Sequence, residues 1–233
     1  YNGTASSYSH TGLDGHTTYY YSAWAYNSTT HQYSTNYDTT SATTENTAPS
    51  VSNEYPVNGS TNIDPQPTCH VTVSDSDGDT LTVYWYENST GSWVLRQTNA
   101  SISSGSTVSW TYTQASNYDT TYYWKVAVND SIDNTTAIYH FTTKTLNPPT
   151  GFTATAVSAS QIDLSWTKSP DGNYTVIRYS TTNYPASLSD GFLAYNGTAS
   201  SYSHTGLDPH TTYYYSAWAY NSTTHQYSTN YDT

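Results

Sequence analysis

The sequence has few charged residues, and positive charge is the scarcer sign. Charged side chains make up 9% of the 233 residues, against about 25% in an average soluble domain. The only cations are Arg96, Lys125, Lys144, Lys168 and Arg178, and the net charge is −12. Nucleic acids and anionic membrane surfaces are bound by clustered Lys and Arg. We therefore expect neither as a partner.

Cysteine, methionine and long apolar runs are also scarce or absent. Cys69 is the only cysteine, so no disulfide can close within the chain. It lies in the alternating stretch PTCHVTV, which predicts a small core residue rather than a reactive thiol. No apolar run approaches the roughly 18 residues of a membrane span. Because there is no Met and no signal-peptide pattern at Tyr1, we expect a processed product or a piece of a longer chain.

The residues that are abundant favour β-structure. Tyr contributes 27 residues, and Ser and Thr together roughly a third of the chain. Runs rich in β-branched and aromatic residues alternate with turn residues at intervals of about ten, and no stretch has helical periodicity. The sequence therefore predicts an all-β chain, with strands in the runs LTVYWYE (81–87), VSWTYT (108–113), TYYWKVAV (121–128), QIDLSW (161–166), YTVIRYS (174–180) and TTYYYSAWAY (211–220).

A long internal repeat is the most specific feature of the sequence. Residues 1–39 and 195–233 differ only at Gly15, which corresponds to Pro209. The offset of 194 residues is about the length of two small domains in tandem. Both Gly15 and Pro209 suit a turn with a φ near −65°.

Two proline-containing stretches, ENTAPSV (45–51) and TLNPPTGF (145–152), predict joints between domains, because proline stiffens a linker and cannot donate to a sheet. The predicted organisation is a partial domain at 1–39, a linker at 40–47, and complete β-sandwiches at 48–145 and 146–233.

The last of these domains resembles fibronectin type III. The resemblance depends on PPTGFTATAVSASQIDLSW, in which Trp166 ends the second strand, and on TGLDPHTTYYYSAWAYN. The second stretch contains the family's L-x-P-x-T-x-Y element as Leu207, Pro209, Thr211 and Tyr213. The resemblance implies a corner in which the Tyr213 hydroxyl bonds to nearby backbone. Alternation then directs Tyr213, Tyr215, Ala217 and Ala219 to the core, and Tyr214, Ser216, Trp218 and Tyr220 to the other side.

The middle domain resembles an immunoglobulin-like sandwich of microbial surface proteins. The stretches that carry this resemblance are YPVNGSTNIDPQPTCHVTVSDSDGDTLTVYWYE and TTYYWKVAVND. The corner tyrosine would be Tyr122, with Trp124 and Val126 on the same face. Asp119 stands where the type III pattern has proline, which leaves the subfamily open.

Residues 1–39 correspond to the last three strands of the type III domain without its first strands. Half a sandwich exposes an apolar face and an open sheet edge, and 39 residues are too few to fold readily alone. We expect the chain to be a window on a longer array that repeats every 194 residues. The alternative is that another subunit supplies the missing strands.

The chain has more Asn-x-Ser/Thr sites than chance would give, even with its high content of Ser and Thr. These sites predict a coat of glycans, which would hydrate a surface that has few charges. Thr-rich joints are further candidates for O-linked sugar. The candidate asparagines are Asn2, Asn27, Asn58, Asn88, Asn99, Asn129, Asn134, Asn173, Asn196 and Asn221.

The stretch SDSDGDT places Asp75, Asp77 and Asp79 at alternate positions. Such carboxylates are used in hard-cation sites, but the EF-hand pattern is not met. A structural turn around Gly78 is preferred over a calcium site. The histidines lack the spacing of zinc ligands, and no nucleophile or phosphate-loop motif is present. We expect no cofactor and no enzymatic activity.

Outward-facing aromatic residues are the remaining candidates for contacts. They either pair across a sheet face or form a stacking surface for a neighbouring domain or for carbohydrate. These residues are Tyr214, Trp218 and Tyr220, with Tyr20, Trp24 and Tyr26 in the first copy.

Taken together, these features predict a structural protein: tandem immunoglobulin-like and fibronectin-III-like sandwiches in an extracellular filament, sheath or surface fibre, associating with like modules. The alternative is an adhesin, or a carbohydrate-binding accessory module of a secreted enzyme.

Overall fold

A computed structural model describes all residues, 1–233, and its only regular elements are nineteen β-strands. The prediction of an all-β chain is confirmed. No helix that could cross a membrane is present. The chain divides into two compact units that interleave along the sequence. The first comprises Tyr1–Asn58, Thr68–Thr111 and Tyr123–Tyr139, and the second Gly59–Pro67, Tyr112–Tyr122 and His140–Thr233.

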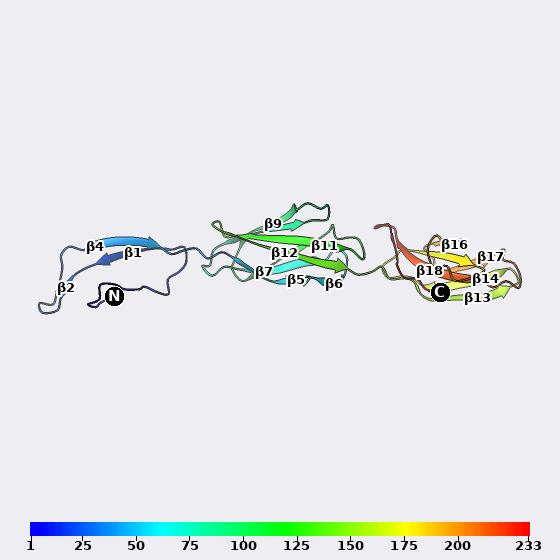
Figure 1. Ribbon diagram of the computed structural model, residues 1–233, viewed down its shortest axis with the longest axis horizontal. Helices are drawn as coiled ribbons and strands as arrows, with labels where there is room; N and C mark the ends of the chain where they lie inside the picture. Colours follow the sequence, from blue (N-terminus) through cyan, green and yellow to red (C-terminus); the bar gives the residue numbers. More distant parts are fainter. The chain divides into compact units, whose positions relative to one another are not determined.

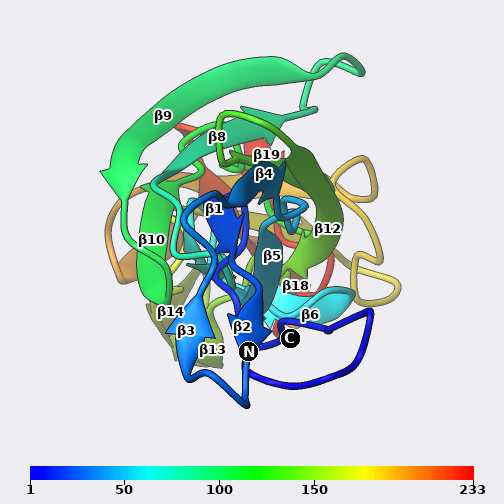
Figure 2. The same ribbon diagram turned by 90° about the vertical axis from the view of Figure 1, so that its left-hand side faces the viewer.

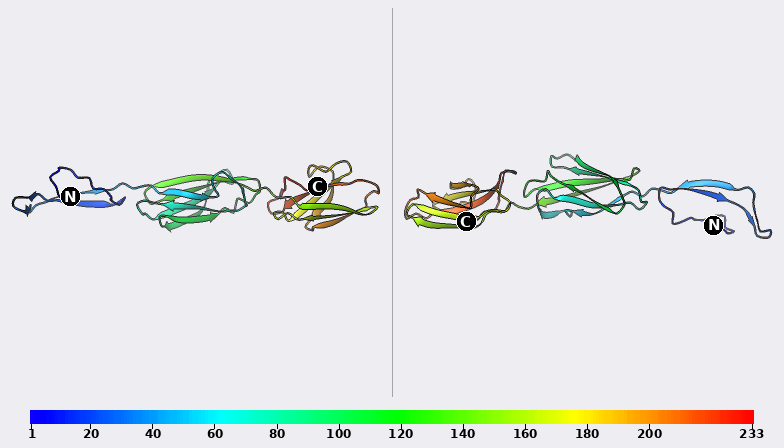
Figure 3. Two further views of the ribbon diagram at one scale, coloured as in Figure 1. Left: turned by 90° about the horizontal axis from the view of Figure 1, so that it is seen from below. Right: turned by 180° about the vertical axis from the view of Figure 1, so that it is seen from behind.

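The first strands of the chain form a separate two-stranded sheet within the first unit (Figure 1). Strand β1 (Thr18–Ala23) pairs antiparallel with β4 (Asp38–Thr43), and a shorter pair joins β2 (Tyr26–Asn27) to β3 (Gln32–Tyr33). The two views of Figure 3 show the segment from the N-terminus running beside this sheet. Strand β4 includes residues 40–43, which the sequence analysis assigned to a linker. Its threonines have β-branched side chains, which suit a strand.

Residues 50–143 form two sheets. In Figure 2 the long strand β9 curves beside its antiparallel partner β8. One sheet has the order β10-β7-β5, formed by Ser106–Thr111, Thr68–Ser74 and Ser50–Tyr55. The other has the order β6-β12-β11-β8-β9, formed by Ser60–Ile63, Asn134–Thr143, Thr121–Asn129, Leu81–Glu87 and Val94–Ile102.

The interior of these sheets follows from strand alternation. Every second residue of β8 is buried, as expected for a strand with one face on a core. The Trp85 ring lies 6.0 Å from that of Trp110 and 5.8 Å from that of Trp124, centroid to centroid. Cys69 is fully buried, and desolvation raises the pKa of its thiol to about 12. The prediction that Cys69 is a core residue is confirmed.

Residues 150–227 form two further sheets in the second unit. Their core contains Leu164, Trp166, Ile177, Tyr215 and Ala217. The three-stranded sheet has the order β13-β14-β17, formed by Thr150–Ser158, Gln161–Thr167 and Ser201–Thr205. The four-stranded sheet has the order β16-β15-β18-β19, formed by Phe192–Gly197, Tyr174–Ser180, Tyr214–Asn221 and Gln226–Tyr227.

Tyrosine corners occur three times along the chain. The backbone N–H of Asp208 donates to the Tyr213 hydroxyl at 2.9 Å, and Asp14 does the same to Tyr19 in the first copy. In the middle region the corner tyrosine is Tyr122, which accepts from a backbone N–H five residues earlier at 3.1 Å. Both predicted corners are confirmed. The sequence predicts a strand from residue 211, but strand β18 begins at Tyr214, directly after the corner tyrosine Tyr213.

Candidate functional site: an aspartate cluster and a divided aromatic repeat

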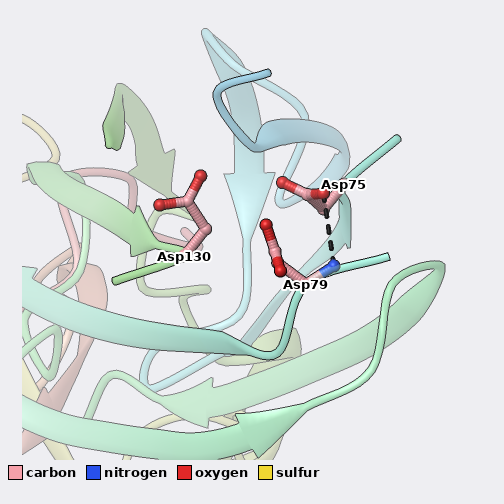
Figure 4. A group of neighbouring side chains, drawn as sticks. All are labelled: Asp75, Asp79 and Asp130. Carbon is pink, nitrogen blue, oxygen red and sulfur yellow. Dashed lines mark hydrogen bonds between the residues drawn. The ribbon is translucent and has the colours of Figure 1, made fainter. Parts of the chain in front are cut away.

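Three aspartates gather in the first unit at the ends of strands. Asp75 directly follows β7, Asp79 lies two residues before β8, and Asp130 directly follows β11. One carboxylate oxygen from each lies within 4.8 Å of the others. Figure 4 shows the Asp75 and Asp79 side chains on one loop, with Asp130 approaching from another.

The loop backbone holds Asp75 in place. Its Oδ1 accepts from the backbone N–H groups of Asp77 at 2.8 Å and Asp79 at 3.4 Å, while its own N–H donates to Ser104 Oγ at 2.9 Å. The residue is 6% exposed. Its second oxygen, Oδ2, is buried without a hydrogen-bond partner, and so is Oδ2 of Asp79. Buried polar atoms in folded proteins are nearly always paired, so these two oxygens need an explanation.

Asp130 is held by its own turn and by the segment before β5. Its Oδ1 accepts from the N–H groups of Ile132 at 2.7 Å and Asp133 at 2.6 Å, and its Oδ2 accepts from Asn46 Nδ2 at 2.9 Å. Burial opposes ionisation of this carboxyl group, but the hydrogen bonds from Asn46 and the turn outweigh it and lower the pKa of Asp130. Asp130 is therefore a carboxylate at neutral pH.

The structure differs from the predicted Asp75, Asp77 and Asp79 group. Asp77 contacts the segment before β5 instead, where its Oδ2 accepts from the N–H of Thr47 at 2.6 Å. Its carboxyl group also lies where a Cβ at Gly15 would stand, so the backbone approaches closely at that glycine. Asp130 was missed by the sequence analysis, since no local spacing relates it to the SDSDGDT loop. The only available signal was an aspartate at the end of a buried strand.

No cationic side chain compensates the cluster, because all five are engaged elsewhere. Arg96 pairs with Glu87 at 2.6 Å, and Lys144 pairs with Asp64 and Asp171. The ammonium group of Lys125 lies over the ring of Tyr86. The other two, Lys168 and Arg178, donate to backbone carbonyl groups.

The two copies of the 39-residue repeat have different aromatic environments. Trp218 is 3% exposed, whereas Trp24, its counterpart in the first copy, is 51% exposed. The prediction that Trp218 is exposed is therefore wrong. Each indole packs against a tyrosine at about the same centroid distance, 4.8 Å to Tyr231 and 4.9 Å to Tyr37.

The difference comes from neighbouring strands. Strand β18 pairs with β15, which places Val176 opposite Trp218 in the register. Strand β1 pairs only with β4, so the first copy has no strand in the position that β15 has beside β18. Tyr214 and Tyr220 are half-buried, and Tyr20 and Tyr26 in the first copy are exposed.

The candidate glycosylation sites fall into two groups by accessibility. Asn2, Asn27, Asn134 and Asn196 are exposed, and no hydrogen bond engages their Nδ2 atoms. Asn58 and Asn173 are also exposed, with the Asn173 Nδ2 donating to Ser222 Oγ at 2.7 Å. The remaining sites, Asn88, Asn99, Asn129 and Asn221, are half-buried, and the Nδ2 atoms of Asn129 and Asn221 donate to backbone carbonyls.

The C-terminal part of this chain is similar in sequence to a known protein family. Residues 147–232 match the sequence profile described as "Fibronectin type III domain". This part of the chain is therefore similar to fibronectin type III domains. A comparison with curated proteins finds no match to the sequence.

Three of the solved structures that match this chain are segments of several domains. Domains A168–A170 from titin share 12% identity at a TM-score of 0.33, covering 84% of this chain and 67% of that one. The chicken CNTN1 FN1–FN3 domains share 17% identity at 0.30, covering 89% and 73%. A two-domain fibronectin type III segment from chicken tenascin shares 11% at 0.36, covering 72% and 91%. With TM-scores below 0.5, these likenesses support no inference about function.

Proposed function

We propose that this chain is a non-enzymatic structural segment of an extracellular filament, sheath or surface fibre, built from tandem fibronectin-III-like and immunoglobulin-like modules. One observation carries the proposal: a single 39-residue sequence occurs twice, once with its core face covered and once with that face open. Fibronectin type III domains typically serve in structural and adhesion proteins and are not typically catalytic. The modules we propose are 1–39, 48–145 and 146–233, joined by the segments around Pro49 and Pro148.

The open copy lacks the partners that its sequence has in the other copy. Ala217 and Tyr215 are buried against strands β14 and β15, while the corresponding Ala23 is exposed and Tyr21 is only half-buried. Apolar side chains that are buried in one copy and exposed in the other are suited to being covered by the same neighbours in both. The occupant that fits is a second copy of strands β13–β16, because the identical sequence already packs against these strands.

Repetition of one such completed unit gives a periodic fibre. We propose self-association with like modules as the main interaction and carbohydrate as the alternative partner. The net charge of −12 disfavours nucleic acid. A surface or extracellular location agrees with the candidate glycans and with the match of residues 147–232 to fibronectin type III domains, which are often surface-exposed or extracellular.

Glycosylation is part of the proposal because the surface has few charged groups to hydrate it. Sugar is expected first at Asn2, Asn27, Asn134 and Asn196, where the Nδ2 atom is exposed and unbonded. Asn129 and Asn221 are expected to remain bare, because attachment there would break a hydrogen bond to a backbone carbonyl. Peptide mass spectrometry of the native protein measures the occupancy at each site.

Whether these strands cover the open face of the first copy is tested with a chain extended before Tyr1 by a copy of residues 146–194. We expect Trp24 to become buried, with a blue-shifted emission relative to the 233-residue chain, and the open copy to unfold cooperatively. If the emission of Trp24 is unchanged, the open face is not completed by these strands.

The filament role is tested on the native material by electron microscopy with antibodies against the chain. Labelling of fibres at an axial period of one two-domain unit supports the proposal. Labelling confined to a tip would indicate an adhesin. Labelling of a soluble secreted hydrolase would indicate an accessory module. Either of these outcomes would overturn the filament role.

A further inference from the structure

We infer that Asp75, Asp79 and Asp130 form a binding site for a divalent cation, with Ca²⁺ preferred over Mg²⁺. All three residues belong to the first compact unit, on the β7–β8 loop and the β11–β12 turn.

The carboxylate oxygens of the three aspartates are placed so that they can share one ion. One oxygen from each carboxylate lies within 4.8 Å of the others, close enough for one ion to contact all three at typical Ca²⁺–oxygen distances of about 2.3–2.6 Å. The Asp75 side chain is directed across the loop toward the other two (Figure 4). The ligands come from segments more than 50 residues apart in the sequence, so the folded sheets assemble the site.

Buried oxygens in this cluster have no hydrogen-bond partner. Asp75 is more than nine-tenths buried, and its Oδ2 accepts no hydrogen bond. Oδ2 of Asp79 and Oδ1 of Asn46 are buried and unpaired as well. The Asn46 amide belongs to the same cluster, since its Nδ2 donates to Asp130 and Asp133. Such orphaned acceptors are expected where a ligand completes the site.

The negative charge of the cluster has no cationic side chain beside it. Three carboxylates at this separation repel one another, and none of the five Lys and Arg side chains is available to neutralise them, because each is engaged elsewhere. A bound cation would remove this repulsion and satisfy the unpaired oxygens together.

The chemistry of the donors selects the ion. The cluster offers carboxylate oxygen, with an amide oxygen adjacent, and no imidazole or thiolate, so soft and borderline metals are disfavoured. Ca²⁺ accepts irregular arrangements of six to eight oxygens completed by water, whereas Mg²⁺ demands a near-ideal octahedron. A site assembled from two loops fits Ca²⁺ better.

The test is calorimetric titration of the chelator-treated 233-residue chain with CaCl₂, repeated with MgCl₂. We expect one Ca²⁺ per chain with a Kd between about 10⁻⁵ and 10⁻³ M, at least tenfold weaker Mg²⁺ binding, and a higher Tm with saturating Ca²⁺. The variant Asp75→Asn with Asp79→Asn should weaken Ca²⁺ binding by at least about tenfold and abolish the Tm increase.

Asp77→Asn is the matched control, because it lies in the same loop but its carboxylate contacts Thr47. It should bind Ca²⁺ like the unchanged chain. Asn at 75 and 79 retains hydrogen-bond acceptors, so without Ca²⁺ the double variant should have a Tm equal to or above that of the unchanged chain. A purely structural role for these carboxylates would instead lower it.

Three results would overturn the inference. The first is absence of any Ca²⁺-dependent heat or Tm change up to about 10 mM, well above the expected Kd. The second is loss of binding in Asp77→Asn as complete as in the double variant. The third is a double variant that loses stability without Ca²⁺ and keeps its full response to it.

Discussion

Trp24 and Trp218 lie in identical stretches of sequence, so their burial can be compared directly. Both lie in the stretch TTYYYSAWAYN, and both contact a tyrosine at nearly the same distance. Their exposures of 51% and 3% therefore measure what neighbouring strands contribute. Local sequence and the contact with tyrosine are the same in both copies.

This pair gives a prediction about stability. Trp218→Ala should lower the free energy of unfolding by about 3–5 kcal/mol, because it removes a large buried side chain and leaves a cavity. Trp24→Ala should change it by less than about 0.5 kcal/mol, as for most surface substitutions. Urea denaturation followed by circular dichroism measures both. Equal losses would show that the first copy is also packed in solution.

Buried His204 gives a second prediction at this scale. Its Nδ1 lies 3.0 Å from the Tyr215 hydroxyl, and desolvation lowers the pKa of His204 below its usual 6.5. The unfolded chain therefore protonates the His204 imidazole more readily than the folded chain does. The stability due to the neutral form is present above about pH 6.5 and is lost as the pH falls from there through the lower native pKa.

The unfolding free energy should accordingly fall as the pH is lowered from about 7 through the native pKa of His204, and His204→Gln should reduce that slope. His10→Gln, at the exposed counterpart in the first copy, is the matched control for the substitution itself. Denaturation curves at several pH values measure it. An unaltered slope in His204→Gln would contradict the assignment.

At the scale of elements, the sheet of β1 and β4 is an isolated pair of strands. Isolated two-stranded pairs are marginally stable in water, and β1 has a partner on one side only. Strand β18 contains the same residues from Tyr214 onward but is also hydrogen-bonded along its length to β15.

Amide hydrogen exchange should therefore differ between identical sequences. Amides at residues 20–23 should exchange at least about tenfold faster than those at 214–217. Peptides that include Gly15 or Pro209 distinguish the two copies by mass. In the chain extended by residues 146–194, protection of 20–23 should rise toward that of 214–217. Equal protection in the unextended chain would contradict the prediction.

At the scale of the whole molecule, charged side chains are scarce, and Lys144 forms ion pairs with two of the aspartates. Lys144 lies in the segment between β12 and β13 and contacts Asp64 Oδ1 at 2.7 Å and Asp171 Oδ1 at 2.9 Å. Hydrogen bonds to both aspartates raise the pKa of Lys144. Asp64 is 80% exposed and Asp171 is 8% exposed. The Asp171 contact is therefore the stronger one, since water screens the other.

Lys144→Ala should leave the buried Asp171 carboxylate without its cation. We expect a loss of about 1–3 kcal/mol in unfolding free energy and faster proteolytic cleavage within residues 144–149. Lys168→Ala is the control, since that exposed side chain contacts only the carbonyl of Thr198. Limited proteolysis and denaturation of the two variants measure the difference. Equal cleavage rates would show that Lys144 does not order this segment.

Much of the fold could be predicted from the sequence because strand signals are local. The runs 81–87 and 174–180 coincide with β8 and β15. Alternation identified the buried residues Cys69, Tyr122, Trp124 and Val126. The tyrosine corners could be predicted because their hydrogen bonds span only five residues.

The sequence by itself determined the strands, the repeat and the corners, since each depends on neighbours along the chain. Only the tertiary structure decided that Trp218 is covered and Trp24 is not, because the covering strand is distant in sequence. It also decided that Asp130 joins Asp75 and Asp79 while Asp77 turns to Thr47. Burial and ligand geometry depend on which strands meet, and strand pairing is set by long-range packing that no single stretch of sequence encodes.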